Sequence, residues 1–214
     1  MRVNGLSTAN LLYCAISSGV KKLIYVSTGH VYNDHLEGVV SESTKAENLN
    51  PYASSHRTGE DLVRNADHQN LIEGTVIRLA NGYGAPAHRG VNCWMLLVND
   101  LCRQAVETGE IMLKSSGFQL RDFIPMTSVC KIIHALIVLD RKDFTYDLYN
   151  VGSGLSMSVW EMDNLVKRRC EKIFCRDIFL SRTGMVEKIV SFNSVLRDCF
   201  MLTLIIPYPI TPVS

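Results

Sequence analysis

Apolar residues along the chain fall into short uninterrupted runs that are separated by longer amphipathic stretches. The runs at 22–27 and 75–80 are rich in β-forming residues, and turn-forming residues follow each of them. Short apolar runs of this kind predict strands that are buried on both faces of a parallel sheet. Amphipathic stretches at 7–19, 51–68 and 126–139 predict helices, so the pattern as a whole indicates an α/β fold.

The second half of the chain continues this pattern less regularly. It predicts one long helix and two short strands, at 91–108, 111–113 and 148–152 respectively. Ser158 and Glu161 have the spacing of a capping box, which predicts that a further helix begins there. The pattern fades after Cys175, and the proline-broken segment 201–214 predicts no element.

The composition is that of a chain that can bury a core of its own. It has 214 residues, of which 47% are apolar, enough for one large domain or two small ones. Lys and Arg number 22 and Asp and Glu number 21, with no basic block, so we expect neither a nucleic acid nor a membrane surface as a partner. The start of the chain has no signal-peptide pattern, and no stretch approaches the ~18 apolar residues of a membrane span.

The seven cysteines are scattered along the chain, and none forms a Cys-x-x-Cys pair. An odd number of scattered cysteines is typical of reduced thiols in a cytosolic protein rather than of a disulfide framework or a zinc site. We therefore expect a cytoplasmic protein, and the sequence contains no evident ligand set for a metal.

Residues able to transfer protons gather around the first apolar run and the helix after it. Ser27 and Thr28 directly follow that run, where ligands meet the carboxyl ends of strands in open α/β sheets. Tyr52 and His56 are four residues apart, which places them on one face of the helix that Pro51 is expected to start. Two hydroxyl groups, a phenol and an imidazole make a candidate proton-transfer set.

Five sequence motifs give the chain a resemblance to a known family. They are YVSTGHVY, PYASSHRTGE, VIRLANGYGAP, LRDFIPMTSV and YNVGSG, which begin at residues 25, 51, 76, 120 and 149. In order and spacing they resemble the extended short-chain dehydrogenase/reductases, in particular the NAD-dependent epimerase/dehydratase group that acts on sugar nucleotides. The resemblance spans about three quarters of the chain. It implies a partial Rossmann-like parallel sheet with a small mixed substrate-side lobe, and NAD as the cofactor.

The resemblance assigns catalytic and cofactor roles to the candidate residues. It implies that Tyr52 is the general acid/base on the sugar C4 hydroxyl, with Thr28 as its hydroxyl partner and Ser27 adjacent. His56 stands where the family has a lysine that binds the nicotinamide ribose and lowers the tyrosine pKa. An imidazole is mostly neutral at pH 7, so His56 either keeps only ribose hydrogen bonding or works as a cation in an acidified site. Asn4 matches an asparagine that approaches the cofactor, with a helix-flanking turn residue as the equal alternative.

The resemblance also names residues for the substrate. Asn81 matches an asparagine that holds the sugar nucleotide, against the alternative of an ordinary turn residue. Arg121 matches an arginine that grips the substrate diphosphate, and a planar guanidinium suits phosphate well. The alternative for Arg121 is a surface ion pair with Asp122. Asn92 is a further candidate contact with the nucleotide.

Two departures from the family pattern limit what the chain is expected to do. Gly29 and His30 stand where dehydratases have an Asp-Glu pair, which favours epimerisation or oxidoreduction at C4 over dehydration. The Gly-x-x-Gly-x-x-Gly loop that approaches the cofactor pyrophosphate is absent from the sequence. We therefore expect an N-terminally truncated family member that lacks its first strands, so that 22–27 becomes an apolar sheet edge.

Two regions and two alternative functions follow from the resemblance. Residues 1–86 are expected to be the remnant of the NAD-binding domain and 87–214 the substrate-binding region, of which about 121–152 packs back on the first. The expected function is that of a 4-epimerase-like, NAD-dependent enzyme acting on a nucleotide sugar. The alternative is a non-catalytic homologue that binds a nucleotide sugar or pairs with a full-length partner. A homodimer through the helices at 7–19 and 52–68 would match the habit of the family.

Overall fold

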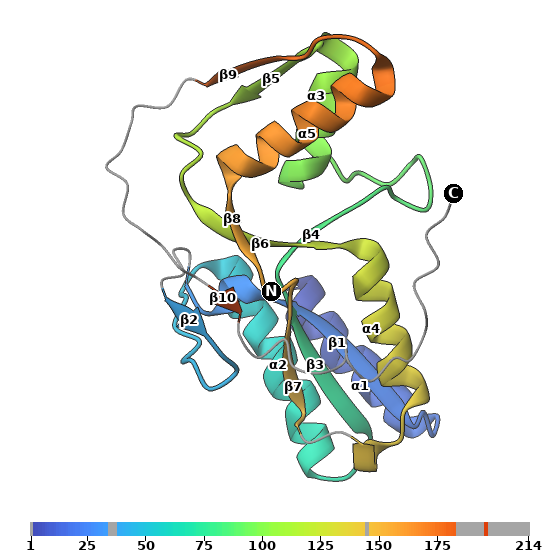
Figure 1. The fold of residues 1–214 in the computed structure, drawn as a ribbon. Helices are drawn as coiled ribbons and strands as arrows, with labels where there is room; N and C mark the ends of the chain where they lie inside the picture. The colour runs from blue at the N-terminus through green and yellow to red at the C-terminus, as the bar shows by residue number, and fades with distance from the viewer. Residues whose placement is uncertain (1, 34–37, 144–145, 183–194, 197–214) are drawn as a thin grey trace.

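The chain folds into a sheet-based lobe and a smaller mixed lobe, which are joined through short strands (Figure 1). The computed structural model describes residues 2–33, 38–143, 146–182 and 195–196. The segment 201–214, for which the sequence predicts no element, lies outside the described residues.

The first lobe is built on a three-stranded parallel sheet in the order β1-β3-β7. Its strands are β1 (Lys22–Thr28), β3 (Glu73–Leu79) and β7 (Leu148–Val151). Lys22 pairs with Glu73, and the register continues to Thr28 opposite Leu79. The carboxyl ends of β1 and β3 therefore lie side by side.

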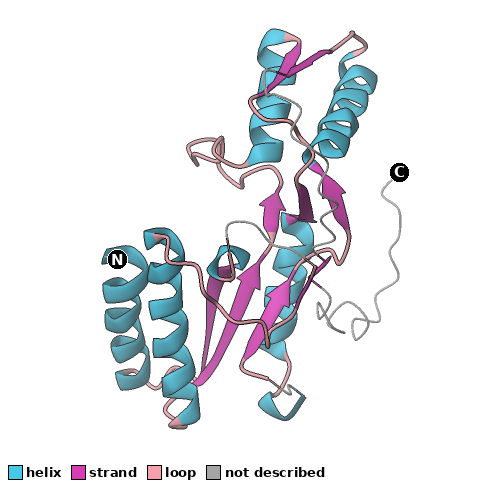
Figure 2. Cartoon of the chain, turned by 90° about the vertical axis from the view of Figure 1, so that its left-hand side faces the viewer, coloured by secondary structure: helices cyan, strands magenta, loops and turns pink. Residues whose placement is uncertain are grey.

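Helices cover both faces of this sheet, with α1 and α2 on one face and α4 on the other (Figure 2). The three helices are α1 (Thr8–Ser17), α2 (Pro51–His68) and α4 (Met126–Val138). Successive residues of β3 point to opposite faces, as in any strand. Val76 accordingly packs with Val63 of α2, while Ile77 packs with Val129 of α4. Cover on both faces explains why the middle of the strand is apolar on both sides.

Within the described part of the chain, β1 is an edge strand that pairs only with β3. Val26 in this strand is 43% exposed, which agrees with the apolar edge predicted at 22–27. At its amino end, Lys22 donates from Nζ to the carbonyl of Ile137 at 3.2 Å and so binds the last turn of α4.

The second lobe packs two helices against two paired strands. These elements are α3 (Leu97–Thr108), α5 (Val159–Phe174), β5 (Glu110–Leu113) and β9 (Phe179–Arg182). Their common core includes Leu101, Ile111, Met162 and Val166. Asp163 is buried in the same lobe, and neither of its carboxylate oxygens has a partner among the described residues. Desolvation raises the pKa of Asp163 to about 7.

Short elements connect the two lobes and complete the chain. The connecting strands are β4 (Asn81–Tyr83), β6 (Leu120–Pro125) and β8 (Ser156–Ser158), in which β4 and β6 are parallel and β6 and β8 antiparallel. The remaining elements are η1 (Arg2–Ser7), η2 (Gly29–Val31), η3 (Arg141–Asp143) and the parallel pair of β2 (Val39–Val40) with β10 (Val195–Leu196). In the described residues no helix combines the length and apolarity needed to cross a bilayer.

Most of the predicted helices are confirmed, and one predicted helix start is wrong. α1, α2 and α4 correspond to the three amphipathic stretches, and the capping box of Ser158 and Glu161 begins α5. The helix predicted from residue 91 begins only at Leu97. Val91, Trp94 and Met95 are each at least 46% exposed, so a longer helix would have buried no additional apolar stripe.

Candidate active site

The carboxyl end of β1 leads into a tight turn that fixes Thr28. Thr28 is buried and caps η2 (Gly29–Val31), because its Oγ1 accepts a hydrogen bond of 3.2 Å from the backbone N–H of His30. The side-chain amide of Asn48 donates to the His30 carbonyl at 2.7 Å, so the turn is held from two directions. No described residue accepts the hydrogen of the Thr28 hydroxyl, which is therefore able to donate to a ligand.

Tyr52 projects from the first turn of α2. Asn50 caps this helix, because its Oδ1 accepts from the Tyr52 N–H at 2.9 Å, and Pro51 occupies the first turn as predicted. Tyr52 is 53% exposed, whereas Ala53 beside it is fully buried. The start of α2 therefore presents a phenol to solvent and buries the next side chain.

Four titratable rings, here called the ring row, lie next to one another at this end of the molecule. The ring centroid of Tyr52 is 6.5 Å from that of His30 and 4.6 Å from that of His56. The centroid of His56 is in turn 6.2 Å from that of Tyr25. Thr28 adjoins the ring row because it binds the N–H of His30. Of the predicted catalytic residues, Tyr52 and His56 are thus direct neighbours, and Thr28 is linked to the row through the backbone of His30.

Burial decides the charge of His56. Desolvation lowers the pKa of this imidazole, and the carboxylate of Glu60, one turn further along α2, opposes the shift without reversing it. The pKa lies below the ordinary 6.5, so His56 is neutral at pH 7. Of the two roles that the sequence leaves open for His56, this favours hydrogen bonding over a fixed cation.

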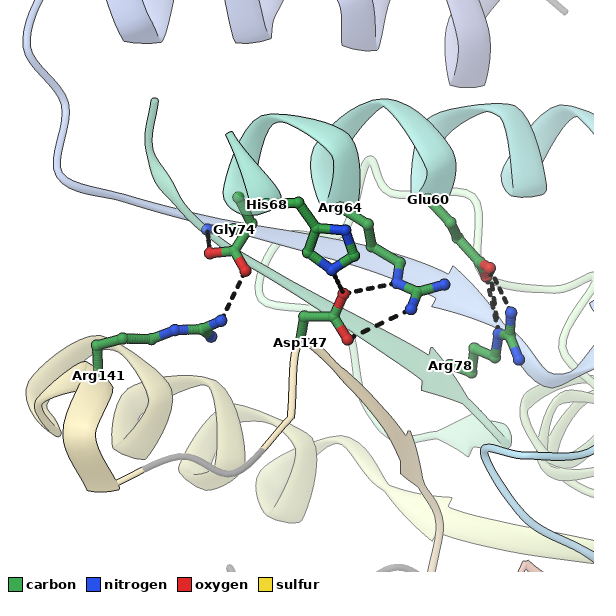
Figure 3. Close-up of polar contacts among 8 residues, drawn as sticks. Glu60, Arg64, His68, Gly74, Arg78, Arg141 and Asp147 are labelled. Atoms are coloured by element: carbon green, nitrogen blue, oxygen red, sulfur yellow. Dashed lines mark hydrogen bonds and ion pairs between the residues drawn. The ribbon is translucent and has the colours of Figure 1, made fainter. Parts of the chain in front are cut away.

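Ser27 lies in a different environment from Thr28, although the two residues are adjacent. It is buried, and its Oγ donates to Glu60 Oε1 at 2.5 Å. Glu60 pairs in turn with Arg78 of β3, with 2.6 Å between Nη2 and Oε2 and 3.0 Å between Nε and Oε1 (Figure 3). The hydrogen of the Ser27 hydroxyl is therefore engaged by Glu60, and the residue ties β1 to α2.

The Glu60–Arg78 pair belongs to a buried network that sequence reasoning missed. Both residues are at most 5% exposed. The guanidinium carbon of Arg78 lies 4.7 Å from the ring centroid of Tyr32, whose hydroxyl donates to Asn150 Oδ1 at 2.7 Å. The available signals were an arginine inside the apolar run of β3 and a glutamate eight residues after Tyr52, on the same face of α2. A buried, hydrogen-bonded ion pair holds β1, α2 and β3 in one arrangement.

Arg121 is partly buried in β6 and has no charged or hydrogen-bonded partner among the described residues. Desolvation lowers its pKa, although a guanidinium stays protonated at neutral pH. Asp122 does not pair with it, since the Asp122 carboxylate accepts from the N–H groups of Ser153 and Gly154 at 2.7 and 2.9 Å. A partly desolvated guanidinium without an anion is a favourable place for an anionic ligand.

The three predicted asparagines lie in different places. Asn81 donates from Nδ2 to the Asp122 carbonyl at 3.1 Å and so fastens β4 to β6, the strand of Arg121. Asn4 donates from Nδ2 to Ser55 Oγ at 3.1 Å and fastens η1 to α2. Asn92 is exposed in the segment between β4 and α3, and no described contact joins it to another candidate residue.

A second polar cluster lies at the amino ends of β3 and β7 (Figure 3). The ligand atoms of Asp67, His68 and Asp147 all lie within 4.8 Å of one another, a spacing that could hold a metal ion. Both carboxylates are already paired, however, since Arg64 Nε is 2.8 Å from Asp147 Oδ2 and Arg141 Nη2 is 2.6 Å from Asp67 Oδ2. Two guanidinium groups neutralise the two carboxylates, so we assign no metal to this cluster.

Comparison with protein families gives a direct match to one family profile. It is the profile of the NAD dependent epimerase/dehydratase family, and it matches residues 1–152. The chain therefore belongs to this family.

Curated relatives include both dehydratases and epimerases. The chain is 28% identical over 160 residues to dTDP-D-glucose 4,6-dehydratase from Homo sapiens, a match that covers 75% of this chain and 43% of that protein. It is 25% identical over 166 residues to a putative UDP-glucose 4-epimerase from Methanocaldococcus jannaschii, covering 77% of this chain and 52% of that protein. The chain thus spans about half the length of the curated relatives it matches.

Solved structures share the fold. UDP-glucuronic acid 4-epimerase from Bacillus cereus, in complex with UDP-glucuronic acid and NAD, superposes with a TM-score of 0.73 at 22% identity, covering 99% of this chain and 63% of that one. DesIV, a dTDP-glucose 4,6-dehydratase from Streptomyces venezuelae with NAD and TYD bound, gives 0.67 at 22% identity, covering 85% and 57%. These similarities confirm the predicted fold class, a partial Rossmann-like α/β architecture.

Proposed function

We propose that this chain carries the acid/base residues of an NAD-dependent enzyme of the epimerase/dehydratase type that acts on a nucleotide sugar with 4-epimerase-like chemistry. The observation that carries the proposal is the half-exposed phenol of Tyr52, which stands between the imidazoles of His30 and His56 at the carboxyl end of β1. A phenol flanked by groups that can accept its proton suits proton exchange with a sugar hydroxyl. Epimerisation is favoured over dehydration because Gly29 and His30 supply no carboxylate.

In the proposed reaction, Tyr52 removes the proton of the sugar C4 hydroxyl and later returns it. Thr28 donates the hydrogen of its hydroxyl to the same sugar oxygen and so orients it. When bound, NAD would supply the hydride acceptor. His56, neutral at pH 7, offers a hydrogen bond rather than a positive field to its neighbours.

The residues present fit one end of NAD. Tyr52 and His56 would hold the nicotinamide ribose, and Asn4 lies nearby, since it binds Ser55 on the same helix. None of the 14 glycines forms the Gly-x-x-Gly-x-x-Gly loop that binds a pyrophosphate. The proposed cofactor role of this chain is therefore limited to the reactive end, which would be held by residues 1–86.

The proposed substrate contacts come from the connecting strands and the region 87–214. Arg121 would bind the diphosphate of the nucleotide sugar, which is supported by its partial burial without an anionic partner. Asn81 lies on the neighbouring strand and would contact the same nucleotide, with Asn92 as a further candidate from the segment before α3.

The alternative is a non-catalytic family member that binds a nucleotide sugar or pairs with a longer partner. Among the described residues β1 has a strand partner on one side only, and the given sequence has no pyrophosphate loop, and both observations favour this alternative. Titration calorimetry with NAD, UDP-glucose and dTDP-glucose separates the two proposals. Binding of both NAD and a nucleotide sugar supports the enzyme, whereas binding of the sugar nucleotide alone supports the alternative.

Tyr52→Phe tests the catalytic assignment itself. We expect this variant to keep binding of the nucleotide sugar and to lose turnover by about 10²–10⁴-fold, because the proton-transfer group is removed. Tyr146→Phe, at an exposed position before β7, is the matched control. Turnover that survives in the Tyr52 variant would show that another residue is the acid/base.

We further propose that α1 and α2 form a homodimer interface. Leu11 and Tyr13 of α1 are 63% and 74% exposed, which leaves apolar surface for a second copy. Sedimentation analysis of Leu11→Glu should show a shift toward monomer if this face is used. An unchanged distribution would contradict it.

A further inference from the structure

Tyr25 holds the inner end of the ring row. Its hydroxyl lies 3.5 Å from the backbone carbonyl of Asn4 and 3.5 Å from His56 Nδ1. Gly59 makes this approach feasible, because a Cβ at that position would lie 2.3 Å from the Tyr25 hydroxyl. The phenol therefore reaches across α2 to His56 through a place that only glycine leaves open.

The two contacts of this hydroxyl can both be hydrogen bonds in only one arrangement. A phenol has one hydrogen and can also accept, whereas the Asn4 carbonyl can only accept. Burial raises the pKa of Tyr25, and the Thr8 side chain, a hydrogen-bond partner that lowers it, does not reverse the shift, so the phenol keeps its hydrogen at neutral pH. With that hydrogen donated to Asn4, the contact with His56 is satisfied only if Nδ1 carries a hydrogen and donates it to the Tyr25 oxygen.

We propose that Tyr25 is a positioning residue that holds His56 in the Nδ1–H tautomer and so leaves Nε2 as a hydrogen acceptor beside Tyr52. This inference rests on the proposed function, because it describes how His56, in place of the family's lysine, assists Tyr52 as the acid/base. The His56 ring centroid is 4.6 Å from that of Tyr52. No described hydrogen bond joins the Tyr52 hydroxyl to His56, so the transfer runs through one bridging water: the O–H bond of Tyr52 breaks as its proton passes to the water, and the water passes another proton to Nε2, which gives a phenolate and an imidazolium with no change in total charge.

The groups around His56 are consistent with this exchange. Glu60 follows it by one turn on α2 and favours the imidazolium once it has formed. Tyr52 on α2, His30 in η2 and Tyr25 in β1 are the other titratable rings of the row, and Asn4 of η1 is uncharged. A relay of this kind needs a neutral His56 before each proton transfer, unlike a lysine, which acts as a cation.

The tautomer of His56 can be measured without any turnover. Two-bond ¹H–¹⁵N spectra at pH 8 distinguish a protonated from an unprotonated ring nitrogen, and His56→Gln identifies the signals among the six histidines. We expect protonated Nδ1 and unprotonated Nε2 in the native chain and loss of this preference in Tyr25→Phe. Tyr146→Phe, at an exposed position before β7, should change nothing. A native His56 that carries its hydrogen on Nε2, or a Tyr25 variant with an unchanged tautomer, would overturn the proposal.

Turnover with NAD and UDP-glucose provides the functional readout. Tyr25→Phe should lower kcat about tenfold and leave the KM for NAD within about twofold, since the ring stays in place and only the hydroxyl is lost. An unchanged kcat would overturn the inference. If the native chain turns nothing over, the proposed function fails, and the tautomer measurement still decides the role of Tyr25.

Discussion

Two polar clusters occupy opposite ends of one sheet, and they differ in how their groups are partnered. At the amino ends of the strands, Asp147 and Asp67 are each paired with an arginine, and His68 adds a third contact at 3.0 Å to Asp147 (Figure 3). At the carboxyl end, Tyr52 is half exposed and Thr28 keeps a hydrogen to donate. Carboxylates that are neutralised internally have nothing left for a ligand, whereas an exposed phenol and a hydroxyl that keeps its hydrogen can exchange protons or hydrogen bonds with one.

The Glu60–Arg78 pair is another example of groups that are neutralised internally, and it lies close to the candidate site. It lies one turn from His56 on α2, yet both of its charges are satisfied internally, and it engages Ser27 as well. We therefore assign this pair to the framework of the site, with the field of Glu60 on His56 as its only link to the chemistry. Variants that remove one partner at a time test that division.

The largest effect is expected from Arg78→Met. Removing the guanidinium leaves the buried Glu60 carboxylate without its cation, which typically costs about 3–5 kcal/mol of the free energy of unfolding. Urea denaturation monitored by circular dichroism measures the loss. Arg103→Met, which breaks a more exposed ion pair with Asp100 on α3, is the control and should have little effect. Equal losses in the two variants would contradict the framework role.

Asp163→Leu should stabilise the second lobe, because Asp163 is a buried carboxylate without any described partner. Its pKa is raised from 3.8 to about 7, so the unfolded state ionises first and stability falls as pH rises from about 4 through 7. At pH 9 the free energy of unfolding of Asp163→Leu should exceed that of the native chain by about 4 kcal/mol, because each unit of pKa shift corresponds to about 1.4 kcal/mol. Asp163→Asn should flatten the same pH dependence. Native stability that does not fall between pH 4 and 8 would argue against a buried ionising group.

Asp147→Asn tests the cluster at the amino end. Burial raises the pKa of Asp147, but the hydrogen bond and charge of Arg64 outweigh it, so the net shift is downward. The contribution to stability is therefore present above about pH 4 and is lost as pH falls below it. We expect a loss of about 1–2 kcal/mol at pH 7 with ligand binding intact. Asp140→Asn, in an exposed pair with Lys142, serves as the control.

His56→Lys gives the smallest expected effect. A lysine stays charged at neutral pH and would stabilise a phenolate by its field, so the pH optimum of turnover should move downward by about one unit or turnover should rise. His134→Lys on the exposed face of α4 controls for the added charge. If neither the optimum nor the turnover responds, His56 takes no part in the mechanism.

Hydrophobic periodicity was sufficient to predict the helices and strands that bury a regular stripe. β3 reads as an apolar run because α2 and α4 cover its two faces, and α2 begins at Pro51 because Asn50 and Pro51 suit a helix start. The same reasoning failed at residue 91, where exposed apolar residues precede α3 without any surface to bury them. Apolar residues predict a helix only where the folded chain offers a surface for them to pack against.

The sequence by itself determined the fold class and the spacing that brings a tyrosine and a histidine onto one face of a helix, since both depend on local periodicity. Only the tertiary structure decided which of two adjacent hydroxyls is engaged. Neighbouring residues of a strand point to opposite faces, so Ser27 meets Glu60 of α2 while Thr28 turns toward η2. The contact between Tyr25 and His56 was likewise set by packing between segments far apart in the chain, as was the position of Arg121, which has no anionic partner in the described part of the chain.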